Sequence, residues 1–244
     1  MTLNFEFLDK YFPMFIQGAG TTILLAACTV ILGVLLGLFL CLFRLSNFKP
    51  LRFLTRFKGS KFFGWLAIVG EFNPLKFLAV AYIEIIRGTP LLVQLLIIYF
   101  GVIPPIEGVE FFAGVLALSI NSGAYVAEII RSGIQAVDIG QMEAARSLGM
   151  KYSMAMKKII IPQAIKNILP ALGNEFVVVI KESSIVYVIG NVLELTFMAK
   201  TVQSMTFRAL EPLLVSAVIY FIITFTTSKL LGIAERRMKK SERK

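Results

Sequence analysis

The feature that most constrains this chain is a set of long apolar stretches, several of which approach the length of a membrane span. A transmembrane helix needs about 20 predominantly apolar residues. Hydrophobic residues make up 57% of the 244 residues, charged residues only 16%, and the mean hydropathy is +0.79. A soluble domain of this size needs more polar surface than that. The sequence therefore predicts an integral membrane protein with a single polytopic domain.

The apolar stretches predict an all-α membrane fold of about five transmembrane helices. Their approximate bounds are residues 15–43, 75–100, 111–137, 171–192 and 213–233. The first contains Gly33 and Gly37, a spacing that allows close helix packing but also arises by chance. The second is interrupted between Arg87 and Pro90. Because proline breaks helices, and a membrane tolerates breaks only inside protein or beside a wet cavity, we expect a covered break there.

The basic residues gather in segments that five spans would place on one side of the membrane. These segments are residues 44–61, with six Lys or Arg and no acid, residues 138–170, and the tail after residue 233. Residues 101–110, on the other side, contain no Lys or Arg. Since positive loops stay in the cytoplasm, we expect the N-terminus outside and the C-terminus in the cytoplasm. This accounts for the net charge of +10, and no nucleic-acid binding is expected.

Some site chemistries are not expected from the residue content. The chain has two cysteines, Cys28 and Cys41, both in the first apolar stretch, and no histidine. Neither a disulfide framework nor a His-based metal site or catalytic triad is therefore predicted.

The segment between the third and fourth predicted spans, residues 138–170, has the marks of a short cytoplasmic helix–turn–helix. Asp138 is suited to cap a helix start. Gly149 suits the left-handed position that ends a helix. A second helix is expected over about residues 152–161, ending at Pro162.

This segment resembles the coupling motif of the membrane subunits of ABC importers. The motif residues are Glu143, Ala144, Ala145, Gly149, Ile159, Ile161 and Pro162, where Ile161 replaces the usual leucine. Residues 86–94, 124–135 and 170–176 resemble the polar amino acid permease subfamily. The resemblance covers the first span and residues 75–244, whereas residues 53–73 depart from it and look like a cytoplasmic insertion.

The resemblance implies a permease subunit of an ATP-driven importer in the bacterial inner membrane. Such a chain pairs with a second permease chain, identical or paralogous, around a pathway with alternating access. Two cytoplasmic ABC ATPase subunits receive the coupling segments and bind ATP and Mg. An extracytoplasmic binding protein delivers a polar amino acid, for which basic amino acids are candidates. This chain lacks the phosphate-binding P-loop motif, so no cofactor is expected on the chain itself.

Polar side chains within the predicted spans are candidates for the substrate pathway. They are Asn121, Ser122, Tyr125, Glu175, Lys181 and Glu182. Ionisable groups at membrane depth are expensive and usually functional, although a single amide or hydroxyl often only bonds a neighbouring helix. Two interpretations of Glu175 stay open: contact with the cationic group of a substrate, or membership of an ion network between subunits.

Two pairs with helical spacing are expected to be structural ion pairs. Glu84 and Arg87 lie three residues apart, as do Glu128 and Arg131, and that spacing puts both partners on one helix face.

Two other functional classes were weighed against the importer subunit. A secondary transporter or channel that works alone usually shows more spans or an internal repeat, and no repeat is visible. A membrane enzyme needs an identifiable nucleophile and base, and the scattered carboxylates suggest none.

Overall fold

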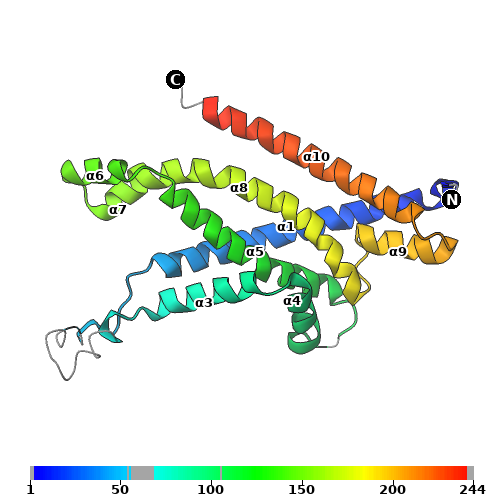
Figure 1. Cartoon of the computed structure of the whole chain (residues 1–244), viewed down its shortest axis with the longest axis horizontal. Helices are drawn as coiled ribbons and strands as arrows, with labels where there is room; N and C mark the ends of the chain where they lie inside the picture. The colour runs from blue at the N-terminus through cyan, green and yellow to red at the C-terminus, as the bar shows by residue number, and fades with distance from the viewer. Residues whose placement is uncertain (1–2, 54, 56–68, 105, 241–244) are drawn as a thin grey trace.

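The fold is a bundle of helices, seen in a computed structural model that describes residues 3–53, 55, 69–104 and 106–240 (Figure 1). The long helices are α1 (Leu8–Leu45), α5 (Glu110–Gln135), α8 (Ile161–Glu182) and α10 (Glu211–Lys240). The shorter ones are α3 (Pro74–Gly88), α4 (Leu91–Ile97), α6 (Ile139–Ser147), α7 (Tyr152–Ala155) and α9 (Leu195–Thr206). The described residues contain no strand, so the predicted all-α class is confirmed.

Three helices are each long and apolar enough to cross a membrane, namely α1, α5 and residues 211–237 of α10. Helix α3 passes the same test when joined to residues 91–102, although the two parts are bent by 110°. The described residues thus supply three or four candidate spans. Helix α8 carries Lys166, Glu175, Lys181 and Glu182 and is not among these candidates. The count of five spans stays a prediction.

The break predicted in the second span is confirmed. Helix α3 ends at Gly88, and α4 begins at Leu91. Thr89 has an extended backbone, with φ −121° and ψ 147°, as expected for a residue before proline. Helix α4 then continues into a π-helical turn, η2 (Ile98–Val102).

The predicted helix end at Pro162 is wrong, whereas the fourth span over residues 171–192 stays a prediction. Helix α7 continues through a π-helical turn, η3 (Met156–Ile160), directly into α8. Pro162 lies in the first turn of α8, where a missing N–H group leaves no intrahelical bond unmade. Consequently Glu175 lies well inside α8 rather than near its start. A 3₁₀ helix, η4 (Ser183–Ile189), covers most of the remaining predicted span.

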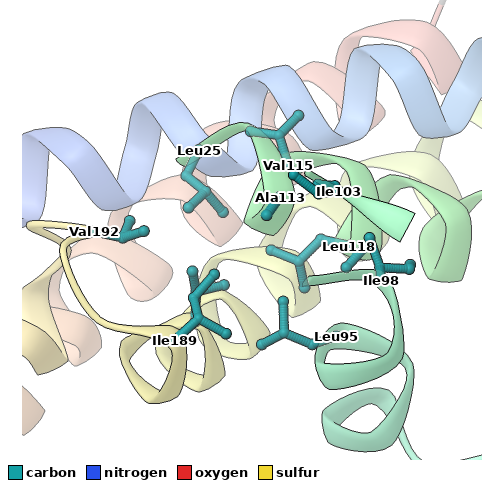
Figure 2. Packing of buried hydrophobic residues seen from close by; sticks show 11 residues of the cluster. Leu25, Leu95, Ile98, Ile103, Ala113, Val115, Leu118, Ile189 and Val192 are labelled. Atoms are coloured by element: carbon teal, nitrogen blue, oxygen red, sulfur yellow. The ribbon is translucent and has the colours of Figure 1, made fainter. Parts of the chain in front are cut away.

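The bent span is held in place by an apolar core (Figure 2). Leu25 of α1, Leu95 of α4, Leu118 of α5 and Ile189 of η4 are all buried in this one cluster. These side chains point toward one another from segments far apart in the sequence. The core therefore holds α4 against α5 and η4.

The segments predicted to share one side of the membrane lie toward one end of the molecule. The end of α1, the start of α3, the α6–α7 hairpin and the C-terminal half of α10 are all directed to this end, and α9 and the N-terminus lie at the other (Figure 1). Most of the predicted insertion at residues 53–73, namely residues 54 and 56–68, lies outside the described residues.

The close packing of α1 on α5 depends on glycine, as the small-residue spacing suggested. A Cβ atom on Gly33 would lie 3.0 Å from the Ser122 hydroxyl oxygen. A Cβ atom on Gly37 would lie 2.5 Å from a Val126 methyl carbon and 2.9 Å from the Ala127 backbone nitrogen. The backbones of the two helices can be this close only without those side chains.

We predict that Gly37→Ala destabilises the protein by about 2 kcal/mol, because the added methyl group overpacks the α1–α5 contact. Gly20→Ala is the matched control, since a Cβ atom there meets nothing within 4 Å and alanine favours the same helix. Thermal unfolding of both variants in detergent measures the effect. Equal thermal midpoints for the two variants would contradict the assignment.

Candidate functional site

The α6–α7 hairpin is built by the capping residues that the sequence predicted. The Asp138 carboxylate accepts a 2.6 Å hydrogen bond from the Gly140 backbone N–H at the start of α6. Gly149 has φ +82°, a left-handed conformation that glycine adopts without strain. The Met150 N–H donates to the Ala145 carbonyl at 3.1 Å, which closes the helix end in a Schellman motif. The predicted start and end of this helix are therefore confirmed.

The predicted coupling residues divide into an exposed group and a supporting group. Ala145 is buried where α6 meets α7 and η3, and Ile159 is half-buried. The exposed motif residues are Glu143, Ala144, Gly149, Ile161 and Pro162. The two alanines of the motif thus have different surroundings: one packs inside the hairpin, and the other leaves room for a neighbour.

Exposed apolar side chains beside the motif were missed by the sequence reasoning. Leu148 is 85% exposed and Ile139 is 74% exposed, and Tyr152 is also largely exposed. Leu148 is the capping residue next to Gly149, a position that ends the helix and turns the side chain away from the bundle. Several exposed apolar side chains on one short hairpin are typical of a surface that binds another protein. We define these three side chains together with the exposed motif residues as the coupling tip.

Gln94 bridges the break between α3 and α4, a role that the sequence reasoning also missed. Its amide nitrogen donates to the Ile86 carbonyl at 2.7 Å, and to the Thr89 carbonyl at 3.1 Å and hydroxyl at 2.8 Å. Its amide oxygen accepts from Asn121 of α5 at 2.9 Å. Gln94 and Asn121 are both buried. Asn121, predicted as a pathway residue, is thus used to hold the bent span.

Ser122 and Glu175, two more predicted pathway residues, are in contact. The Ser122 hydroxyl donates to a Glu175 carboxylate oxygen at 2.8 Å. Their exposed fractions are 1% and 8%, so the contact between α5 and α8 is closed to solvent. Lys181 is exposed, Glu182 is half-buried, and neither forms a salt bridge within the described part of the chain. Glu182 nevertheless lies near enough to Glu175 for the two charges to interact.

The predicted ion pair of Glu84 with Arg87 is wrong for the described residues. The Arg87 guanidinium instead lies over the ring of Tyr125, 5.3 Å from the ring centroid, in a cation–π contact. Glu84 is exposed and has no salt bridge in the part of the chain that the structure describes. Tyr125, predicted as a pathway residue, is 38% exposed.

The second predicted ion pair is confirmed and belongs to a larger group. Arg131 contacts one carboxylate oxygen of Glu128 at 2.7 Å, three residues away on α5. Arg44, in the last turn of α1, pairs with the other oxygen. The pairing of Arg44 with Glu128 was not predicted from the sequence, because the two residues are 84 positions apart. The Arg44–Glu128–Arg131 triad fastens α1 to α5 near the end of the bundle that carries the coupling tip.

Glu194 holds the opposite end of the bundle. Its carboxylate accepts from the Thr196 and Phe197 backbone N–H groups at 2.7 and 2.6 Å, and from the Tyr220 hydroxyl of α10 at 3.0 Å. The next residue's N–H donates to the Thr22 hydroxyl of α1 at 3.1 Å. Burial raises the pKa of Glu194 to about 7, and the hydrogen bonds that it accepts oppose that shift. The Glu194 side chain thus ties α9 to α10, and the Leu195 N–H links the start of α9 to α1.

The described residues contain no group of three or more His, Cys, Asp or Glu side chains that could hold a metal ion.

Comparison with known proteins decides the family. The model of the family described as binding-protein-dependent transport system inner membrane component matches residues 62–240. The chain belongs to this family. It is therefore a transport subunit of the inner membrane.

Relatives of this inner membrane component match along nearly their whole length. The arginine transport system permease protein ArtQ of Bacillus subtilis (strain 168) is 37% identical, with 99% of this chain and 100% of that protein covered. A putative glutamine transport system permease protein, GlnP of Rickettsia conorii, is 38% identical, with 96% and 98% covered.

A solved structure agrees with the fold. A chain of a crystal structure described as an amino acid ABC transporter with histidines is 52% identical and has a TM-score of 0.82, with 97% of this chain and 100% of that chain covered. A chain of the MetNI methionine ABC transporter, at 16% identity and a TM-score of 0.65, shares the fold.

We predict that Gln94→Leu destabilises this inner membrane component by about 2 kcal/mol, because it leaves the buried Asn121 amide and the freed carbonyls without partners. Asn121→Leu is expected to lower stability less in the Gln94→Leu background than in the wild type, since the hydrogen bond between the two side chains is already lost. Gln17→Leu, the same change at an exposed position on α1, is the control. Unfolding in detergent measures all four, and strictly additive losses would contradict the shared network.

Proposed function

We propose that this chain is the permease subunit of an ATP-driven ABC importer for polar amino acids, with basic amino acids as the first candidates. It works by alternating access in the bacterial inner membrane, with its N-terminus outside and its C-terminus in the cytoplasm. Its partners are a second permease chain, two cytoplasmic ATPase subunits that bind ATP and Mg, and an extracytoplasmic binding protein. ATP is hydrolysed by the ATPase subunits and not by this chain.

The observation that carries this proposal is the exposed coupling tip. Leu148 and Ile139 present apolar surface on a capped hairpin whose inner face is packed by Ala145. A short helix with exposed apolar side chains suits binding in a groove of another protein. On the proposed function, the coupling tip binds in a groove of the ATPase subunit.

The arrangement of polar residues supports a pathway shared with a second chain. Glu84 and Arg87 of α3, Tyr125 of α5 and Lys181 of α8 are exposed on the bundle surface. Lipid tails solvate charged groups poorly, so such residues usually face another protein surface or water. We infer that these side chains face the second permease chain or the pathway between the two chains.

The choice of substrate class rests on the relatives and on the site. One relative is named for arginine transport and another for glutamine transport, and the similar solved structure is described as an amino acid transporter. We infer that Tyr125 and Lys181, which are exposed, contact the pathway. The buried Ser122–Glu175 pair is then placed behind its wall as a link between α5 and α8.

Coupling can be tested at Gly149, whose left-handed backbone strains any larger residue. We expect Gly149→Val to lower substrate-stimulated ATP hydrolysis of the reconstituted complex at least about tenfold, because the strain distorts the hairpin end and moves the tip. Glu143→Lys is expected to act in the same direction by reversing a charge at the docking surface. Membrane insertion of both variants should be unchanged.

Gly108→Val is the matched control for the coupling test. Gly108 also has φ +82°, and, as at Gly149, an added Cβ atom meets nothing within 4 Å. It lies in the loop before α5, away from the coupling tip. Stimulated hydrolysis should be close to wild type in this variant. Equal loss in both glycine variants, or normal hydrolysis in Gly149→Val and Glu143→Lys, would contradict docking through the tip.

The substrate can be tested by uptake into proteoliposomes that contain the full complex. We expect uptake of arginine, lysine, glutamine or cystine, and uptake of only an unrelated compound such as a sugar would contradict the proposal. Glu175→Gln distinguishes the two interpretations of this residue. A structural link between helices predicts equal loss of arginine and glutamine uptake, whereas a specific rise in the arginine KM would show that Glu175 contacts a cationic substrate.

A further inference from the structure

A cavity of about 620 Å³ lies where α1 ends and α3 begins, apart from the coupling tip and the predicted pathway residues. Its polar side includes Arg44, Lys49 and Lys76, with Glu71 as the one acidic residue of the lining. Its apolar side includes Phe72 and Phe77. The cavity is therefore amphiphilic, with more positive than negative charge.

The charges of this cavity favour an anion. Lys49 pairs with Glu71, and Arg44 pairs with Glu128 in the triad described above. Lys76 forms no salt bridge with any residue that the structure describes. It also lies in the first turn of α3, where the helix dipole attracts anions and disfavours a cation. A negative group bound here would therefore be stabilised both by Lys76 and by the start of the helix.

The apolar side of the cavity distinguishes a lipid from a small anion. Phe72 and Phe77 are 47% and 58% exposed, and their ring centroids lie 5.6 Å apart. A free phosphate ion would use only the charged side and would leave both rings exposed. Because α1 is a candidate span that ends at Leu45, we infer that the cavity lies at the depth where lipid headgroups meet acyl chains.

We propose that this cavity binds an anionic phospholipid, with the phosphate near Lys49 and Lys76 and the acyl chains along Phe72 and Phe77. Basic cavities between transmembrane helices are a known type of site for acidic headgroups. The lipid would lie against Arg44, whose pairing with Glu128 fastens α1 to α5. The bound lipid would thus stabilise the end of the bundle from which the coupling tip extends.

Native mass spectrometry of the purified full-length chain in detergent tests this site with two probes, phosphatidylglycerol and phosphatidylcholine. Phosphatidylglycerol is expected to bind more tightly. The double variant Lys49→Gln/Lys76→Gln should weaken its binding about 25-fold, taking about fivefold for each charge. Lys10→Gln/Lys229→Gln, which removes the same charge outside the cavity, should bind like the wild type.

A third variant, Phe77→Asn, separates a lipid from a free anion. It should weaken binding of phosphatidylglycerol but not of glycerol phosphate, which lacks acyl chains. Equal affinity for the two lipids, equal loss in both lysine variants, or inorganic phosphate binding as tightly as phosphatidylglycerol would each overturn the proposal. Circular dichroism checks that every variant keeps the wild-type helix content. If the double lysine variant loses it, Lys76→Gln alone replaces it, and if Phe77→Asn loses it, Phe77→Ala replaces it.

Discussion

A helix that breaks within a membrane protein must find new partners for the backbone groups that the break sets free, and the α3–α4 bend depends on this constraint. No water is available in the hydrocarbon region, and each unpaired group there costs several kcal/mol. The Gln94 amide nitrogen donates to the Ile86 and Thr89 carbonyls, and the Gln94 amide oxygen accepts from Asn121. The 110° bend is thereby part of the bundle's stable structure.

The rest of the bundle is organised around α1 and α5, and three kinds of interaction hold these helices. Gly37 lets the backbones approach closely in the middle. At the end with the coupling tip, Glu128 joins arginines of both helices, and at the other end the Leu195 N–H links α9 to Thr22 of α1 while Glu194 links α9 to α10. Each charged contact is shielded or multiply bonded, as charges near a membrane require. Together they form a frame against which other elements can move.

Local features of the sequence predicted local features of the structure well. Asp138 and Gly149 set the bounds of α6 because capping depends on a few neighbouring residues. The break at Pro90 and the pairing of Glu128 with Arg131 were predictable for the same reason, since each depends on residues that are near in the sequence. These predictions needed only the backbone preferences of single residues and the helical repeat.

Predictions failed or were absent where distant residues decide the outcome. Arg87 pairs with Tyr125 of another helix and not with its helical neighbour Glu84. The roles of Arg44 and Gln94 depend on partners brought close only by folding. Pro162 was taken as a helix end, but the π-helical turn before it makes it the start of α8. Sequence spacing cannot distinguish these two uses of proline.

The continuity of α7, η3 and α8 has a mechanical consequence for the proposed function. A helix that stopped at Pro162 would leave a flexible joint between the coupling tip and the bundle. Instead the hairpin leads without a break into the helix that carries Glu175. On the proposed function, a displacement of the tip would pass along α8 to the buried contact between Ser122 and Glu175. Since α5 is held to α1 by glycine packing and the Glu128 triad, this contact is where motion of α8 against the frame must be accommodated.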